Sequence, residues 1–235
     1  MQVRRKLFIP GPTEVGDDIL RELAKPLIGH RTQEMTELYE SIVENTKKLF
    51  KTPDYHVFII TSSGMGLMEA AIRNTVNRDV LVTVCGAFSE RWYKIGVANG
   101  KQTDKLEVEW GKAVKPEHLE EMLSKKKYEA VTITQNETST GVRNPLKELV
   151  KVIHEHDALV LVDAVSSLGG DWFDISALDL DVVLASTQKA MGMPPGLAVL
   201  FVNDRAMEKA KQVKHRGYYF DFLLHKSNWD RRKQT

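Results

Sequence analysis

The sequence contains very little cysteine and almost no net charge. Cys85 is the only cysteine among 235 residues, which excludes an internal disulfide and fits a reducing compartment. The 33 basic residues balance 32 acidic ones to a net charge of +1, so no overall field attracts nucleic acid or an anionic membrane. The N-terminus lacks a signal-peptide run, and no stretch is apolar enough to span a bilayer. We therefore expect a cytoplasmic protein without nucleic-acid or membrane partners.

The motifs of common nucleotide-binding and metal enzymes are also missing. No Gly-Lys-Ser/Thr element is present, and Gly64 and Gly66 are not followed by the third glycine of a dinucleotide fingerprint. His154 and His156 would point to different faces of a predicted helix, and the other histidines show no ligand spacing. We expect no metal site.

The chain does show a regular alternation of apolar strands and amphipathic helices. This pattern, with strands apolar on both faces, indicates an α/β domain built on a mostly parallel sheet. The expected strands are 56–60, 79–84, 106–109, 130–134, 158–162, 181–185 and 196–202. The expected helices are 17–27, 35–50, 65–77, 89–98, 116–123 and 145–156. We predict a seven-stranded, mostly parallel sheet flanked by helices.

Ligands of such sheets bind beyond the carboxyl ends of the strands, where several residues of this chain stand out. Residues 61–66 bring hydroxyls and glycines to a helix N-terminus, which suits a phosphate, although Ser63 could cap the helix without any ligand. Phe88 follows the second strand and is either a ring at the rim or part of the core. Residues 135–141 form a polar loop after the fourth strand. Asp163 follows the fifth strand. It either caps a helix or turn, or it is a partly buried carboxylate that needs a cation.

Lys189 lies between the last two expected strands, on a segment with two prolines and two glycines. Most lysines are solvated surface charges, so Lys189 alone indicates little. A phosphate cradle, an aromatic ring, a carboxylate and a lysine together are what pyridoxal 5′-phosphate requires. Lys189 would have to be partly neutral, which desolvation near other cations favours.

Several motifs in one order and spacing resemble the class V aminotransferases of the fold-type I pyridoxal-phosphate enzymes, most closely the alanine–glyoxylate and serine–pyruvate branch. The motifs run over essentially the whole chain and read PGPTEV, GHRTQEM, SSGMGLMEAA, GAFSERW, NETSTGV, VDAVSSLGG and STQKAMGMPPG. The resemblance implies the large, cofactor-binding domain of these enzymes over residues 51–235, preceded by an arm and helices over residues 1–50.

The resemblance also implies roles for individual residues. Lys189 would form the Schiff base, and Asp163 would meet the pyridine nitrogen. The other implied cofactor contacts are Ser63, Gly64, Met65 and Gln188 at the phosphate, Phe88 and Val165 on opposite ring faces, Thr138 at the ring hydroxyl, and Thr235 near the phosphate of a partner in a homodimer. The arm at residues 10–12 would line the substrate entrance.

The implied activity is a transamination from a small amino acid, alanine or serine, to a keto acid such as glyoxylate or pyruvate. Family members continue into a small C-terminal domain that this sequence lacks, with an arginine that binds the substrate carboxylate; Arg31 is the replacement we can name. A truncated cofactor-binding, dimerising fragment without full turnover is one alternative. A cysteine desulfurase is disfavoured, because Gln188 stands where those enzymes have a histidine and Cys85 closes a predicted strand.

Overall fold

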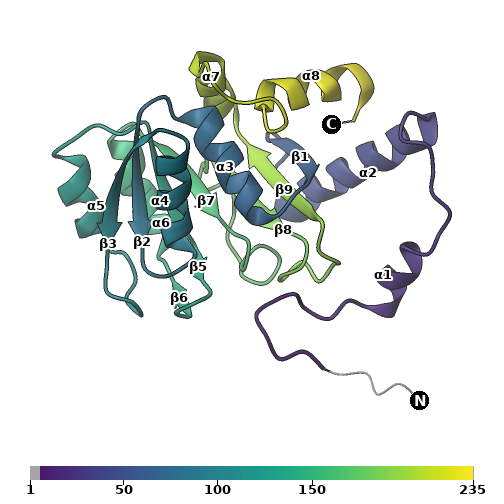
Figure 1. The fold of residues 1–235 in the computed structure, drawn as a ribbon, viewed down its shortest axis with the longest axis horizontal. Helices are drawn as coiled ribbons and strands as arrows, with labels where there is room; N and C mark the ends of the chain where they lie inside the picture. Colours follow the sequence, from purple (N-terminus) through teal and green to yellow (C-terminus); the bar gives the residue numbers. More distant parts are fainter. Residues whose placement is uncertain (1–5, 235) are drawn as a thin grey trace.

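A seven-stranded sheet runs through the centre of the computed structural model, which describes residues 6–234 (Figure 1). Its strands are β1 (His56–Thr61), β2 (Asp79–Val84), β3 (Gln102–Glu107), β4 (Ala130–Thr134), β7 (Leu159–Asp163), β8 (Val182–Ser186) and β9 (Leu197–Val202). They lie in the order β1-β9-β8-β7-β4-β2-β3. Only β9 runs against its neighbours, pairing antiparallel with both β1 and β8. The predicted mostly parallel, seven-stranded α/β sheet is confirmed.

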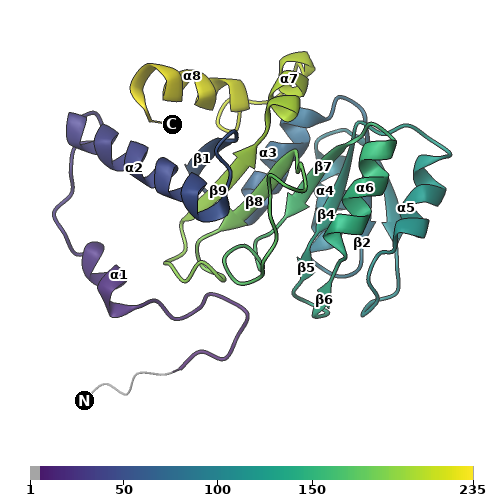
Figure 2. The same ribbon diagram turned by 180° about the vertical axis from the view of Figure 1, so that it is seen from behind.

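Helices cover both faces of the sheet, and each face has its own apolar core (Figures 1 and 2). One core joins the sheet to α2 (Gln33–Phe50), α5 (Pro116–Leu123) and α6 (Leu146–Glu155). The other joins it to α3 (Gly64–Thr75), α4 (Ser89–Ala98), α7 (Asp204–Gln212) and α8 (Phe222–Arg232). Side chains of β7 alternate between them, with Val160 and Val162 on the first side and Leu159 and Leu161 on the second. This two-sided burial explains the continuous apolar runs of the sequence.

The carboxyl ends of four strands meet at one edge of the sheet. Asp163 at the end of β7 is in register with Thr134 of β4 and with Leu184 of β8. The antiparallel strand β9 starts at this edge, because Leu197 pairs with Thr61, the last residue of β1. The segments that follow β1, β4, β7 and β8 therefore emerge side by side.

Some elements differ from the expectation. Strand β3 begins at Gln102, four residues before the predicted start, because it is a polar edge strand without buried side chains. The first helix, α1 (Asp17–Glu22), ends before 27, since Pro26 cannot continue a helix. The sequence patterns did not predict α7 and α8. Nor did they predict the short hairpin of β5 (Asn136–Glu137) and β6 (Val142–Arg143) inside the polar loop after β4.

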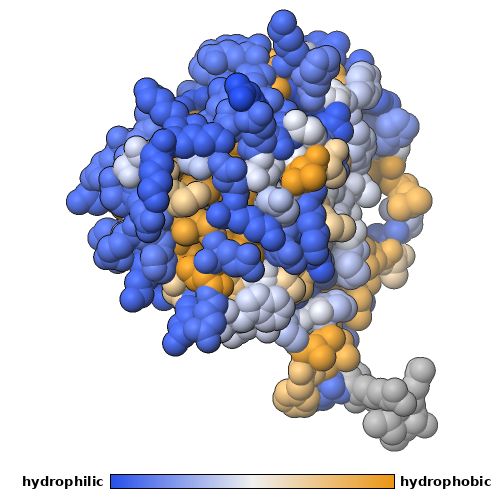
Figure 3. All heavy atoms as spheres, turned by 60° about the vertical axis from the view of Figure 1, so that its left-hand side comes forward, coloured by the Kyte–Doolittle hydropathy of each residue, from blue (hydrophilic) through white to orange (hydrophobic). Residues whose placement is uncertain are grey.

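Residues 6–13 form a segment without helix or strand, here called the N-terminal arm, that lies outside the sheet and its helices (Figure 1). Three consecutive apolar side chains of the arm, Leu7, Phe8 and Ile9, are exposed. Figure 3 shows apolar surface gathered on this segment, whereas polar and charged side chains cover most of the body on the same face. Among the helices of the described residues, none is long and apolar enough to cross a membrane.

Candidate active site

Lys189 lies in the turn that connects β8 to β9, at the edge where the strand ends meet. The turn is closed by hydrogen bonds from the Gly192 amide to the Lys189 carbonyl (2.9 Å) and from the Met193 amide to the Thr187 carbonyl (3.0 Å). Thr187 adds a hydroxyl that lies 2.6 Å from the Pro194 carbonyl oxygen. The backbone that carries Lys189 is therefore held at both ends.

The Lys189 amine is partly buried and lies 5.9 Å from the centroid of the Phe88 ring. Burial lowers the pKa of Lys189, Asp163 opposes this by raising it, and the charge of Arg91 lowers it further. The net effect is a pKa below the usual range of a lysine, which increases the neutral, nucleophilic fraction of the amine.

Asp163 ends β7 with only 5% of its surface exposed. Its Oδ1 accepts a hydrogen bond from the Val165 amide at 2.9 Å. Burial is the main reason that the pKa of Asp163 rises to about 6; the Val165 hydrogen bond lowers it, and the nearby negative charge of Glu137 raises it again. A carboxylate in this position gains most from a cation that approaches from the open edge of the sheet.

The N-terminus of α3 packs closely against the loop that follows Asp163. Ser63 caps the helix by accepting a hydrogen bond from the Gly66 amide at 3.4 Å, so the capping role considered from the sequence is present. Gly64 lies so close to Val165 that a Cβ there would stand 2.4 Å from Val165 Cγ2. The hydroxyl of Ser186 is buried, has no hydrogen-bond partner among the described residues, and lies 3.5 Å from the position of that Cβ. Amides of a first helical turn and a free hydroxyl are the donors that an anion would use.

Phe88 and Thr138 come from two further loops of the same edge. Phe88 precedes α4 and is partly exposed, and the guanidinium carbon of Arg91 lies 4.4 Å from its ring centroid. The Thr138 hydroxyl lies 2.6 Å from the hydroxyl of Ser166, in the loop that follows β7 and three residues beyond Asp163. Sequence reasoning did not single out Arg91, Ser166 or the buried Glu137. The available signal was a charged residue near each of two predicted site residues: Glu137 directly before Thr138, and Arg91 three residues after Phe88.

The N-terminal arm crosses the lysine turn. The Thr13 amide donates to the Gln188 carbonyl at 3.0 Å, and the Thr13 hydroxyl donates to the Lys189 carbonyl at 3.0 Å. A Cβ on Gly11 would lie 2.4 Å from Lys189 Cδ, so the arm touches the lysine side chain itself. The structure thus places the predicted arm directly against the predicted reactive residue.

Some candidates from the sequence lie elsewhere. Arg31 lines a different pocket, of about 280 Å³, together with Tyr218, Asn228 and the arginines of α8, and Lys189 is not part of its lining. Thr235 lies outside the described residues. Cys85 is a fully buried free thiol that lies 3.3 Å from Asn144 Nδ2, and burial raises its pKa. Such a thiol is a poor nucleophile, in agreement with the low weight given to a desulfurase.

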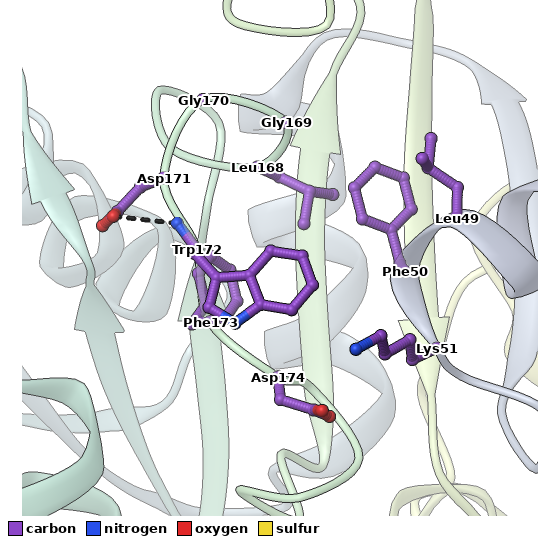
Figure 4. Close-up of a pocket in the computed structure, with 10 residues that line it drawn as sticks. All are labelled: Leu49, Phe50, Lys51, Leu168, Gly169, Gly170, Asp171, Trp172, Phe173 and Asp174. Atoms are coloured by element: carbon purple, nitrogen blue, oxygen red, sulfur yellow. Dashed lines mark hydrogen bonds between the residues drawn. The ribbon is translucent and has the colours of Figure 1, made fainter.

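A separate pocket of about 250 Å³ lies between the end of α2 and the loop after β7 (Figure 4). Figure 4 shows Phe50 and Leu168 facing the ring of Trp172, and the Lys51 amine lies 4.7 Å from that ring. None of the residues predicted to bind the cofactor lines this pocket.

The comparisons with known proteins agree on one family. The family model described as "Aminotransferase class-V" matches residues 22–233. An uncharacterized aminotransferase of Methanocaldococcus jannaschii is 42% identical over 237 residues, which cover 99% of this chain and 61% of that protein. The serine–glyoxylate aminotransferase of Methylorubrum extorquens is 34% identical over 231 residues, which cover 93% of this chain and 58% of that enzyme.

A solved structure shows the same arrangement of elements. The alanine–glyoxylate aminotransferase of a Nostoc species superposes with a TM-score of 0.91 at 28% identity, covering 97% of this chain and 62% of that enzyme. The chain spans about 60% of the length of these relatives. On the evidence of its motifs, its sheet and these matches, the chain belongs to the class-V aminotransferase family.

Proposed function

We propose that the chain binds pyridoxal 5′-phosphate and serves a transaminase that moves an amino group from a small amino acid, alanine or serine, to a keto acid such as glyoxylate or pyruvate. The observation that carries the proposal is the position of Lys189 at the edge of the sheet where the strand ends meet. Its amine lies near the Phe88 ring, it interacts electrostatically with Asp163, and its pKa is lowered. The names of the serine–glyoxylate and alanine–glyoxylate relatives support the choice of substrates.

The residues at this edge suit the cofactor chemically. The start of α3 at Gly64 offers a helix N-terminus for the phosphate, next to Ser63 and Met65, and Ser186 offers a hydroxyl that has no hydrogen-bond partner within residues 6–234. Phe88 and Val165 offer apolar surface for the ring, and Thr138 offers a hydroxyl for the ring oxygen. Asp163 offers a buried carboxylate for the ring nitrogen. When bound, pyridoxal phosphate supplies an electron sink for the bond broken at the substrate Cα.

The chain's own residues would position and move a proton. Lys189, whose pKa is lowered by its burial, can accept a proton at Nζ and return it to a neighbouring carbon. Asp163 would become fully ionised when a cationic group meets it, because that charge offsets the burial that now raises its pKa. The N-terminal arm over Lys189 would restrict the entry of water.

Four further expectations belong to this proposal. They are a homodimer, a cytoplasmic location, the division of the chain into residues 1–50 and 51–235, and a contribution of Gln188 to phosphate binding. A turnover assay with alanine or serine and glyoxylate, set beside a cofactor titration, would separate a transaminase from a cofactor-binding, dimerising fragment without full turnover.

The decisive experiment is a titration of pyridoxal 5′-phosphate into the purified chain, followed by visible absorbance. We expect the wild-type chain to develop the absorbance of the covalently bound cofactor. Lys189→Ala should abolish it, whereas Lys147→Ala, which removes an exposed lysine of α6, should leave it unchanged. No absorbance in the wild-type chain, or the same absorbance in Lys189→Ala, would refute the proposal.

A further inference from the structure

Glu137 is a fully buried carboxylate between the two loops that carry Phe88 and Thr138. It belongs to β5, the short strand after β4, and three residues surround its two oxygens with donors. The Phe88 amide lies 3.2 Å from Oε1 and 3.1 Å from Oε2; the Ser89 amide and hydroxyl each lie 2.8 Å from Oε2; the Ser139 amide and hydroxyl lie 3.1 and 2.7 Å from Oε1. One side chain thus joins the start of α4 to the loop after β5.

The charge of Glu137 is stabilised despite its burial. Burial raises the pKa of Glu137, but the hydrogen bonds from Ser89 and Ser139 outweigh it and hold the pKa below its usual range. The carboxylate also faces the N-terminus of α4, where the helix dipole favours a negative charge. Glu137 is therefore ionised at neutral pH, and both of its oxygens accept hydrogen bonds.

The backbone around Phe88 is shaped to fit Glu137. Gly86 packs so tightly on this side chain that a Cβ at Gly86 would lie 2.6 Å from Glu137 Cγ and 2.6 Å from Ser139 Oγ. The Ala87 amide donates to the Ser139 hydroxyl at 3.0 Å, which adds a second link between the two loops. Phe88, whose amide binds Glu137, and Thr138, which follows Glu137 in the chain, are the two residues proposed to meet the cofactor ring.

We propose that Glu137 is a positioning residue that holds the Phe88 ring and the Thr138 hydroxyl at a fixed separation, so that both meet the same cofactor ring. The effect of Glu137 on cofactor binding rests on the proposed function, whereas its hydrogen bonds join the two loops in the cofactor-free chain. Glu137 also acts on the ring-nitrogen partner, because its charge disfavours a second negative charge on Asp163.

A purely structural cap makes a different prediction. If Glu137 only caps α4, its replacement lowers stability and leaves the cofactor site unchanged in the molecules that remain folded. Glu129 offers a matched comparison, because its Oε2 accepts the amides of Asn77, Arg78 and Asp79 at 2.9, 2.6 and 3.1 Å in the loop before β2. Glu129 lies at the opposite ends of β2 and β4 from the site, adjoining Asp79 and Ala130.

The experiment compares Glu137→Gln with Glu129→Gln. The amide group of glutamine places an NH₂ donor where a carboxylate oxygen accepted hydrogen bonds from Ser89 or Ser139, so these bonds are lost with little change of volume. In the cofactor-free chain we expect faster amide hydrogen exchange at residues 86–89 and 139 for Glu137→Gln only. With pyridoxal 5′-phosphate we expect about tenfold weaker binding and an altered visible circular dichroism of the bound ring for this variant. Glu129→Gln should bind the cofactor as the wild-type chain does.

Several outcomes would overturn the inference. One is unchanged exchange at residues 86–89 in Glu137→Gln; another is wild-type affinity and dichroism in that variant; a third is equal weakening by Glu129→Gln. If Glu137→Gln does not fold, Ser139→Ala serves instead, since Ser139 is an exposed residue and the substitution removes its hydroxyl bond to Glu137. It should weaken binding in the same direction by a smaller factor, and wild-type binding would contradict the inference. A wild-type chain that binds no cofactor refutes the proposed function, while the exchange measurement still tests the link between the loops.

Discussion

At the scale of single residues, Asp163 shows how burial creates a demand for a ligand. The ordinary pKa of its carboxyl is 3.8, and burial at the end of β7 raises it to about 6. The folded chain therefore holds this proton more tightly than the unfolded chain does. The resulting contribution to stability is complete below pH 3.8 and is lost as the pH rises through about 6.

Asp163→Asn should therefore stabilise the cofactor-free chain at neutral pH. Asparagine keeps an oxygen for the Val165 amide and carries no charge. We therefore expect the unfolding free energy of the variant, minus that of the wild type, to be about 3 kcal/mol larger at pH 7 than at acidic pH. The gain should shrink steadily as the pH falls toward 3.8. Urea unfolding of both chains between these pH values measures it. A difference that does not change with pH would show that the Asp163 carboxyl has an ordinary pKa.

At the scale of elements, the contact between α3 and the loop after β7 determines where the helix N-terminus that is proposed to bind the phosphate lies. Gly64 opens the helix and faces Val165 with no room for a Cβ. The backbone of Gly64 is helical, so the position does not need glycine for an unusual backbone conformation. Glycine is required because Val165 leaves no space for a side chain. A side chain at this position would have to displace either the helix or the loop.

Gly64→Ala should lower the unfolding free energy by about 1–3 kcal/mol through this overlap. In a chain that already carries Val165→Ala, the same substitution should cost at least about 0.5 kcal/mol less, because the colliding methyl group is gone. Chemical denaturation of the four chains of this double-mutant cycle measures the coupling. Additive effects would mean that Gly64 and Val165 do not restrict one another.

At the scale of the whole molecule, residues 176 positions apart in the chain are joined where the N-terminal arm crosses the lysine turn. The arm adds no strand to the sheet, and Phe8 in it is 94% exposed. Its attachment near Thr13 depends on the two hydrogen bonds to Gln188 and Lys189 and on the contact of Gly11 with the Lys189 stem. Such a segment can detach without unfolding the sheet.

Thr13→Val should loosen the arm alone. Loss of the hydroxyl that binds the Lys189 carbonyl removes about 1 kcal/mol of attachment, so amide exchange at residues 10–14 should become about fivefold faster. Thr13→Ser keeps the hydroxyl and should behave as the wild-type chain. Hydrogen exchange read by mass spectrometry measures both, with the global unfolding free energy as the control. Equal exchange in Thr13→Val and wild type would show that this hydrogen bond does not hold the arm.

Much of the architecture could be predicted, because local patterns carry it. Helix 116–123 and strand 130–134 have the predicted bounds, since a proline starts the helix and an uninterrupted apolar run forms the strand. Strand β3 was predicted too short because an edge strand needs no apolar side chains. The polar helix α7 was missed for a related reason, as three small or flexible residues, Ala206, Met207 and Ala210, make up its buried side.

The sequence alone determined the family, the parallel sheet and the identity of Lys189 and Asp163 as candidates, because motifs and apolar runs are local in the chain. Only the tertiary structure decided which charges and hydroxyls act on them. It placed Arg91 over Phe88, buried the Ser186 hydroxyl with no partner in the part of the chain that the structure describes, and surrounded Glu137 with donors. It also brought the N-terminal arm onto Lys189 and moved Arg31 to another pocket. Burial and electrostatic neighbours depend on segments that are distant in sequence, so no local pattern encodes them.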